Sequence, residues 1–233
     1  MSTQIPSIDP ANEGELLGAM RHIIGKEIQN LDGMLPAKVV SFDRTRNRAT
    51  VQPLVMLLTT SATTISRATI ASVPVYQIGG GGFMLNFNLQ AGDLGWIKAS
   101  DRDISLFLQE YREAGPNTIR KHDFADSVFY PDVMTGYTIA GEDAENAVLQ
   151  NLDGSVRIAL WPDRVKVTAP TVEAVATDVT VTATTVTINA TDTNINSNVA
   201  IVGSTLTHNG VNVGSTHIHS GVTPGGGVSG GPQ

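Results

Sequence analysis

The sequence predicts a mainly β protein in which a small barrel, preceded by a helix, is followed by a repetitive β region. Three observations predict this: short apolar stretches between turn residues over 34–130, one helical apolar stripe before them, and a seven-residue repeat from residue 165. We divide the chain into an arm and helix (1–33), a barrel domain (34–130), a collar (131–164) and a repeat with its tip (165–233).

The totals exclude several classes of protein. A net charge of −7 and an aromatic content of 5% argue against a nucleic-acid partner. The absence of cysteine excludes disulfides and thiol chemistry. Residues 1–10 are polar and acidic, and no apolar run has transmembrane length, so we expect a soluble protein made in a cytoplasm without a signal peptide.

The helical segment is predicted over 12–31. Leu16, Met20, Ile23 and Ile24 recur at helical spacing and form an apolar stripe. Asn12 and Glu15 have the spacing of a capping box, and Asp32-Gly33 supplies a stop. Such a stripe is a packing surface, either for the chain's own domain or for a neighbouring subunit.

The barrel is predicted from short strands with a hairpin turn at 43–47. Five strands over this length suit a small closed barrel of the OB-fold type. A further apolar piece, 104–111, is either a short helix or a strand. The expected strands are Ala37–Phe42, Ala49–Leu58, Ser72–Ile78, Leu94–Ala99 and Ser127–Tyr130.

Two features of this region resemble functional sites, but for each we predict a purely structural role. The run Gly79–Gly82 lacks a following Gly-Lys-Ser/Thr, so we expect a mobile loop in place of a phosphate cradle. Asp101 and Asp103 stand two apart, but no other ligand lies nearby, so we expect a solvated strand end. In the collar, 141–146 is acidic and loop-like, and 148–158 predicts a hairpin around Asp153-Gly154.

The repeat consists of β-branched residues that recur every seven positions in two registers. One register is Val165, Val172, Val179 and Val186; the other is Val167, Ala174, Val181, Ile188, Ile195 and Val202. Val, Ile and Thr suit strands better than helices, which argues against a coiled coil. Seven residues are too few for one chain to complete a circuit but can cover a third of one. We therefore predict a C-terminal intertwined trimeric β-helix, although a fibrous adhesin stalk would have a similar sequence.

Two histidines near the C-terminus are the candidate metal ligands. In an extended segment, His217 and His219 project to the same side. One chain gives an incomplete site, whereas three chains on a threefold axis give six imidazole nitrogens, a set that fits iron or nickel better than zinc. The alternative to a metal site is that the two histidines form a polar end to a β segment. Gly227–Gly231 matches a hydrolase G-x-S-x-G pattern, but no helix can follow it, so we predict no catalytic residues.

The C-terminal residues resemble a known family. From Ser215 through His217-Ile218-His219 to Gly227 and the Gly-Gly-Pro-Gln end, the chain is similar to the central baseplate spike proteins of contractile-tailed phages. The lead-in Asn209–Gly214 matches too, and the segments 92–95 and 101–104 are similar to the N-terminal OB domain of that family. Ser220 stands where many relatives have glycine, which leaves the two histidines untouched.

The resemblance implies a homotrimer, docked on the baseplate hub protein, that pierces the host outer membrane mechanically during tail contraction. It implies an iron ion at the tip, one per trimer, held by His217 and His219 of each chain, and a place in the virion tail baseplate. We expect neither enzymatic activity nor a small-molecule substrate. The alternative is a receptor-binding fibre or adhesin, but residues 162–233 contain no Trp, Tyr or Phe for such a surface.

Overall fold

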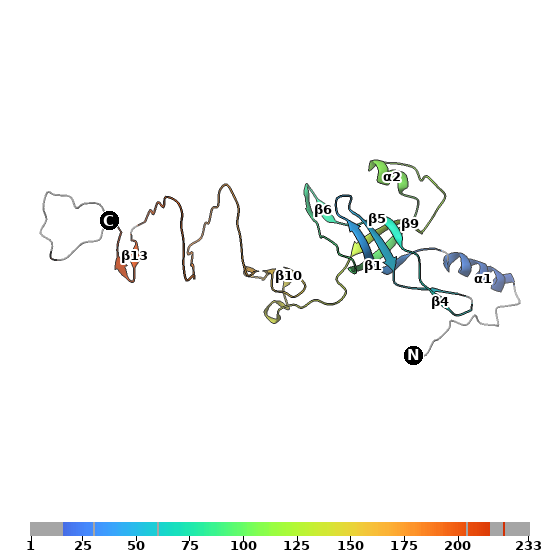
Figure 1. Ribbon diagram of the computed structural model, residues 1–233, viewed down its shortest axis with the longest axis horizontal. Coiled ribbons are helices and arrows are strands. Elements are labelled where there is room, and N and C mark those ends of the chain that lie inside the picture. The colour runs from blue at the N-terminus through green and yellow to red at the C-terminus, as the bar shows by residue number, and fades with distance from the viewer. Residues whose placement is uncertain (1–15, 30, 60, 204, 215–220, 222–233) are drawn as a thin grey trace. The chain divides into compact units, whose positions relative to one another are not determined.

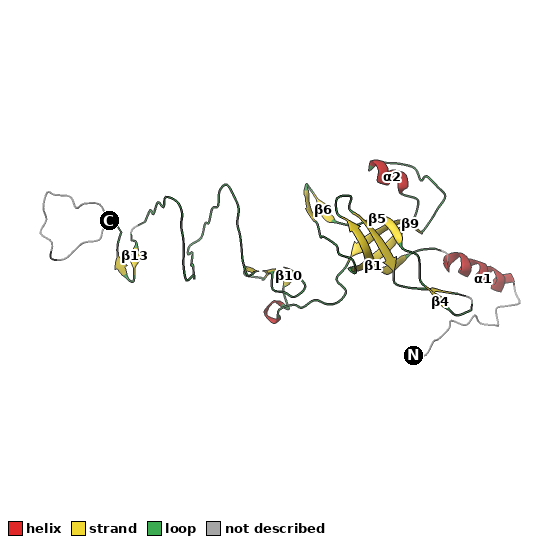
Figure 2. Ribbon diagram, in the orientation of Figure 1, coloured by secondary structure: helices red, strands yellow, loops and turns green. Residues whose placement is uncertain are grey.

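The computed structural model describes residues 16–29, 31–59, 61–203, 205–214 and 221 (Figure 1). The chain divides into two compact units, Met1–Glu173 and Ala174–Gln233. Among the described strands, only those of one short hairpin lie in the second unit, and the protein is mainly β, as predicted (Figure 2).

Helix α1 (Leu16–Gln29) lies within the predicted helical segment. It ends before Gly33, where the amide of Leu31 donates to the carbonyl of Ile28 at 3.2 Å. Its apolar stripe is exposed, with Leu16 at 80% and Ile23 at 61%. The stripe therefore does not pack against the described part of its own chain.

Five antiparallel strands form a barrel-like sheet in the order β5-β2-β1-β8-β9, as labelled in part in Figure 1. These strands are β1 (Met34–Asp43), β2 (Arg48–Pro53), β5 (Ile70–Pro74), β8 (Leu94–Ser100) and β9 (Asp123–Pro131). Each overlaps a predicted strand. The predicted turn between β1 and β2 is also present, closed by a hydrogen bond from the Arg46 amide to the Asp43 carboxylate at 3.1 Å.

The two edges of this sheet approach each other where β5 leads on to Val75. Val75 forms a parallel bridge with Phe129 of β9, and the Tyr76 amide donates to the Phe129 carbonyl at 2.8 Å. The contact nearly closes the sheet into the small barrel that the strand pattern predicts. A closed sheet leaves few unpaired backbone groups at its edges.

The core of the barrel follows from strand alternation. Val51 of β2, Ile97 of β8 and Phe129 of β9 are fully buried, and Val39 of β1 is 1% exposed. Gly95 makes room for the Phe129 ring, because a Cβ at this position would lie 2.5 Å from the Phe129 Cζ and 2.3 Å from the Tyr130 carbonyl oxygen. The adjacent strands can thus pair directly over a large aromatic side chain.

Two short hairpins extend from the barrel and correct the sequence predictions. The expected strand 49–58 is interrupted: β2 ends at Pro53, and β3 (Leu57–Leu58) pairs instead with β4 (Thr64–Ile65). The glycine run 79–82, predicted as a mobile loop, forms the end of one strand and the turn of a second hairpin, β6 (Ile78–Gly80) with β7 (Phe83–Leu85). Gly81 and Gly82 both have positive φ, the geometry that suits a two-residue hairpin turn.

The ambiguous segment 104–111 is a helix, α2 (Ser105–Glu110), which ends at Tyr111 in the left-handed region with φ 52°. In the collar, the 3-10 turn η2 (Gly141–Asp143) precedes a three-stranded sheet of β10 (Ala147–Gln150), β11 (Arg157–Leu160) and β12 (Val165–Thr168). The predicted hairpin is confirmed as the β10–β11 pair. Its loop spans 151–156, where the Asn151 amide donates to the Val156 carbonyl at 3.0 Å.

After β12, the repeat forms no strand between Ala169 and Leu206 in the described residues, and Figure 2 draws this segment as loop. The backbone bends at Pro170, Thr177, Thr184 and Thr191, in step with the seven-residue period of the sequence, and then at Ser197 and Gly203, at a spacing of six residues. The trimeric β-helix stays a prediction. Farther on, β13 (Thr207–His208) pairs with β14 (Val211–Asn212).

Candidate functional site

The predicted metal ligands His217 and His219 lie outside the described residues. His208 is described, in β13, just before the turn Asn209-Gly210, whose residues have φ 50° and 78°. Among the described residues, no group of three or more His, Cys, Asp or Glu side chains could hold a metal ion. The iron site therefore rests on the chemistry of two imidazoles per chain and on the resemblance at the tip.

Within the described residues, the repeat presents an exposed apolar surface. Val172 and Val179 are 69% and 70% exposed, and Ile188 of the second register is 69% exposed. Exposed apolar surfaces of this extent are rare in monomers and mark contact sites.

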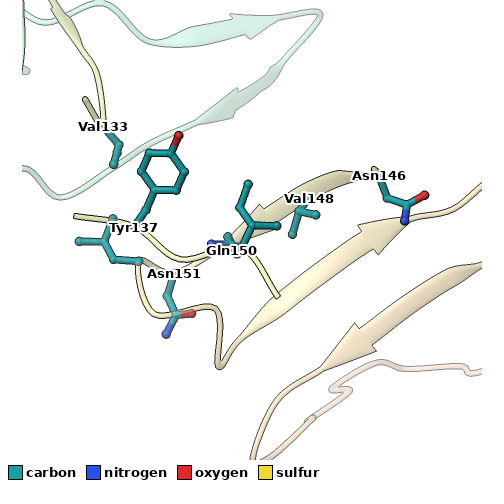
Figure 3. A pocket seen from close by; sticks show the side chains of 8 residues that line it. Val133, Tyr137, Asn146, Val148, Gln150 and Asn151 are labelled. Carbon is teal, nitrogen blue, oxygen red and sulfur yellow. The ribbon is translucent and has the colours of Figure 1, made fainter. Parts of the chain in front are cut away.

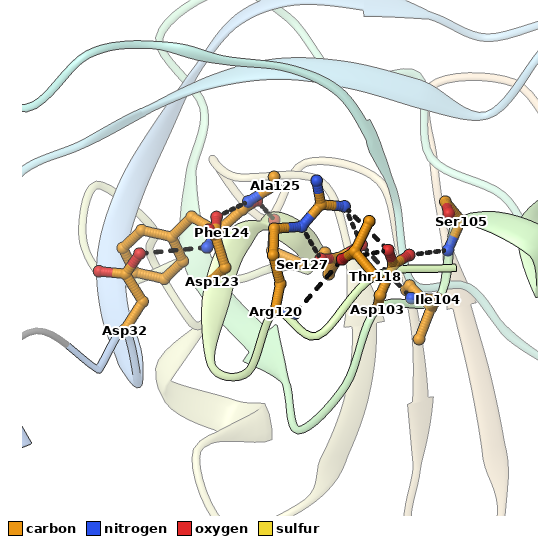
Figure 4. A network of polar contacts seen from close by, with 11 residues as sticks. Asp32, Asp103, Ile104, Ser105, Thr118, Arg120, Asp123, Phe124, Ala125 and Ser127 are labelled. Carbon is orange, nitrogen blue, oxygen red and sulfur yellow. Dashed lines mark hydrogen bonds and ion pairs between the residues drawn. The ribbon is translucent and has the colours of Figure 1, made fainter. Parts of the chain in front are cut away.

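One of two charge clusters in the described residues lies beside β9 (Figure 4). Its hydrogen bonds connect β9 to the start of α2 and to the segment that follows α2. The Asp103 carboxylate accepts hydrogen bonds from the Ser105 amide at 2.8 Å and from the Thr118 hydroxyl at 2.7 Å. The Arg120 guanidinium lies 3.3 Å from Asp103 and donates to Asp126 at 2.9 Å. Two buried carboxylates thus share one arginine.

This cluster corrects the prediction for Asp103. The side chain of Asp101 is 85% exposed, as a solvated strand end should be, but that of Asp103 is fully buried. Hydrogen bonds from Ser105 and Thr118, together with the charge of Arg120, hold the pKa of Asp103 well below its usual value. With Arg120 already paired to it, Asp103 is a structural carboxylate and not a cation ligand.

A second charge cluster lies in the collar, where sequence reasoning found only an acidic loop. The Asp143 carboxylate, fully buried, accepts hydrogen bonds from Arg157 at 2.7 Å and from the Trp161 indole at 2.9 Å. Arg157 also pairs with Glu142, and the Lys166 ammonium lies 2.7 Å from Glu142. The hydrogen bond from Arg157, with that from Trp161, lowers the pKa of Asp143. The network joins η2 to β11 and β12.

One apolar hollow of the collar is small and open (Figure 3). Its volume is about 280 Å³. Val133 and Tyr137 line it from the segment that precedes β10, and Val148 and Gln150 line it from β10. No Asp, Glu, Lys, Arg or His lines it.

Other exposed apolar groups lie on the helix and on the two barrel hairpins. The β6–β7 hairpin exposes Phe83 at 84% and Met84 at 66%, and the β3–β4 hairpin exposes Leu58 at 56%. No helix among the described residues is both long enough and apolar enough to cross a membrane. The described residues thus present several exposed apolar surfaces.

Residues 35–132, which include all five barrel strands except Met34 of β1, match the family model described as the phage protein Gp138 N-terminal domain. The match covers less than half of the chain. No curated protein matches the chain. The family match supports a phage tail- or baseplate-associated protein with a structural role and a place in the virion.

Sequence reasoning missed both buried charge clusters and the hairpin that follows the repeat. The turn Asn209-Gly210 was a readable signal, since Asn-Gly favours a two-residue hairpin turn. The clusters had no such signal. Thr118 and Arg120 lie 15 and 17 positions after Asp103, and only the fold brings them together.

Proposed function

We propose that this protein is the central spike of a contractile phage tail baseplate. Three copies form an intertwined β-helical needle, and tail contraction drives the needle through the host outer membrane. The barrel docks on the baseplate hub protein. The device is passive: it concentrates a mechanical load and catalyses no reaction.

One observation carries this proposal: the repeat has a seven-residue period in its sequence, which the backbone bends follow from Pro170 to Thr191, and its apolar rows are exposed in the single chain. A chain that turns through only part of a circuit in each repeat needs other copies to complete it. The Gp138 N-terminal family match over residues 35–132 supports the phage assignment.

The intertwined arrangement suits the mechanical role. Chains wound about one another must separate together, so the resistance to unfolding is kinetic, a slow unfolding rate more than a large equilibrium free energy. At the tip, His217 and His219 of each chain would hold the iron ion. Neutral imidazole is an established iron ligand, and the bound ion would tie together three chain ends that otherwise fray.

The mass of the protein in solution tests the assembly. Sedimentation equilibrium should give three times the 24.6 kDa of the chain. The trimer should also withstand detergent at room temperature and dissociate only on heating. A species with the mass of one chain contradicts the needle and with it the proposed function.

Elemental analysis tests the tip. The purified protein should hold one iron per three chains, and a His217→Ala/His219→Ala variant should hold none. His208→Ala is the matched control, because its imidazole lies in β13, outside the proposed pair, and this variant should keep the iron. Equal iron in the double variant and the unaltered protein rules out the assigned ligands.

Immunogold electron microscopy of intact phage particles separates the spike from a receptor-binding fibre. Antibodies against the repeat should label the distal end of the tail on its axis. Label on lateral fibres would favour the receptor-binding alternative.

A further inference from the structure

The three-stranded collar sheet has two unlike faces. The strand registers align Leu149 with Ile158 and Ile158 with Val167, and they align Leu160 with Val165. Because side chains alternate along each strand, these residues share one face of the sheet. The face, called here the apolar collar face, consists of Ala147, Leu149, Ile158, Leu160, Val165 and Val167.

The opposite face is covered by the chain itself. It carries Arg157, Ala159 and Lys166, and Ala159 is fully buried. The side chain of Arg157 is 10% exposed and pairs with the buried Asp143 of η2. The usual arrangement is thus reversed: the face with the charged residues is the more covered one, with the Lys166 side chain 36% exposed, and the face without any charge is open.

The apolar collar face is exposed throughout the single chain. Its five large side chains are between 41% (Ile158) and 66% (Val165) exposed. It continues into a hollow of about 320 Å³ that Val172, the next member of the first repeat register, also lines. The sheet therefore shares one apolar surface with the start of the repeat, as far as Val172, and β12 contributes the first member of each register, Val165 and Val167.

We propose that the apolar collar face packs against the same face of two other copies of this chain and fixes the register of the needle. The inference rests on the proposed trimer and adds the surface that aligns its chains. The face fits this occupant because Val165 and Val167 belong both to the sheet and to the rows that three chains would share. A partner that covers the apolar face of the sheet therefore also covers the start of these rows.

The register argument follows from the repeat itself. A chain displaced by seven residues would still set Val beside Val in the first register and apolar residues beside apolar residues in the second, so the repeat alone permits slippage. The collar sheet removes this degeneracy, because Leu149, Ile158 and Leu160 do not recur in the repeat. Their hydrogen-bonded strands present one fixed pattern of large side chains, and that pattern has a single best alignment.

Single cysteines test the surface, because the natural chain contains none. Val167→Cys lies on the apolar collar face, and Thr168→Cys, the next residue of β12, lies on the opposite face. With a short bismaleimide reagent, the Val167→Cys trimer should form covalent links between chains and the Thr168→Cys trimer should not. A three-chain protein in which the two variants link equally, or in which Val167→Cys does not link, overturns the proposal and leaves the trimer standing.

Mixed trimers test the register. Chains with Val167→Cys are coexpressed with size-tagged chains that carry Ala174→Cys, one repeat farther on. In an aligned trimer only like cysteines meet, so links should join chains of the same kind. Adding Ile158→Lys to both chains should produce links between residues 167 and 174. Ile119→Lys, at a loop side chain that is 97% exposed, should not.

The outcomes separate the two claims. A single-chain mass for the unaltered protein defeats the proposed function. If the Ile158→Lys trimer gives no unlike links, the collar does not set the register, whatever the needle does. If Ile158→Lys prevents trimer formation, the Leu160→Ala and Leu149→Ala variants replace it, because they keep the face apolar but remove large side chains from its pattern. These variants should still form a trimer with links between residues 167 and 174. A trimer of these variants without such links overturns the proposal.

Discussion

The barrel and the repeat both contain many β-branched residues, but the barrel buries these side chains within one chain and the repeat leaves them exposed. In the barrel, Val39 and Val51 are at most 1% exposed, whereas Val179 of the repeat is 70% exposed. The barrel strands are long enough to pair with one another and nearly close on themselves through Val75 and Phe129. The repeat bends every six or seven residues, and its described residues form no strand from Ala169 to Leu206.

The difference shows that an apolar strand pattern predicts burial but not the chain that provides it. Burying one Val or Ile side chain stabilises a structure by roughly 1.5–3 kcal/mol. The barrel gains this within one chain, and in the proposed trimer the repeat would gain it on association. The structure of the repeat would then depend on protein concentration and on chain alignment, unlike that of the barrel.

A charge in the repeat has the largest expected effect. Ile188→Asp would place three carboxylates near one another at the proposed axis, where desolvation costs on the order of several kcal/mol per ion. Trimer formation should fail, as measured by sedimentation velocity. The control is Thr187→Asp, which points to the other side of the extended segment and should leave the trimer intact. In a single chain both residues are exposed, so an equal response would contradict a buried axis.

A cavity in the barrel has a smaller effect that stays within one chain. Phe129→Ala removes a fully buried ring and should destabilise the barrel by about 3–5 kcal/mol. Hydrogen exchange should rise in β8 and β9 while repeat peptides and the three-chain mass stay unchanged. Phe83→Ala, at a ring that is 84% exposed, should change stability by less than about 0.5 kcal/mol. If Phe129→Ala also dissociates the trimer, the two regions are not independent.

The elements predicted well are those whose signal is local. The five barrel strands follow from alternation between turn residues, and the Asp43–Asn47 turn follows from its composition. The family match supports the prediction that residues 35–132 form a domain of a phage protein. Gly95 belongs to the segment 92–95, which is similar to the N-terminal OB domain of the spike family. The structure explains the glycine, since a Cβ at this position would overlap the Phe129 ring.

The elements predicted poorly depend on distant partners. Asp103 was expected in solvent because its nearest neighbours in sequence do not explain burial, yet Thr118 and Arg120 enclose it. The role of Asp143 depends likewise on Arg157 and Trp161. The tip is different again: His217 and His219 are identified by their spacing and by the resemblance, and they lie outside the described residues.

Acid should act on the two charge clusters and have the smallest effect of the three changes. The pKa values of Asp103 and Asp143 are lower in the folded protein than in an unfolded chain, chiefly through the hydrogen bonds from Ser105 and Arg157, respectively. Their contribution to stability is therefore complete above the ordinary carboxyl pKa of about 4. It is lost as the pH falls below that value towards the lowered pKa values of the folded state.

Thermal unfolding followed by circular dichroism between pH 6 and pH 2.5 measures this loss. The midpoint should hold steady down to about pH 4 and then fall. An Asp103→Asn variant should start from a lower midpoint and fall less steeply, because a neutral amide keeps the shape of the carboxyl group but has no proton to gain. Asp101→Asn is the control, since the Asp101 side chain is 85% exposed and lies 3.8 Å from His122. A variant at Asp103 with the same acid dependence as the unaltered chain would mean that the buried carboxylate does not stabilise the barrel through its charge, and that the segment around Thr118 and Arg120 is held by packing alone.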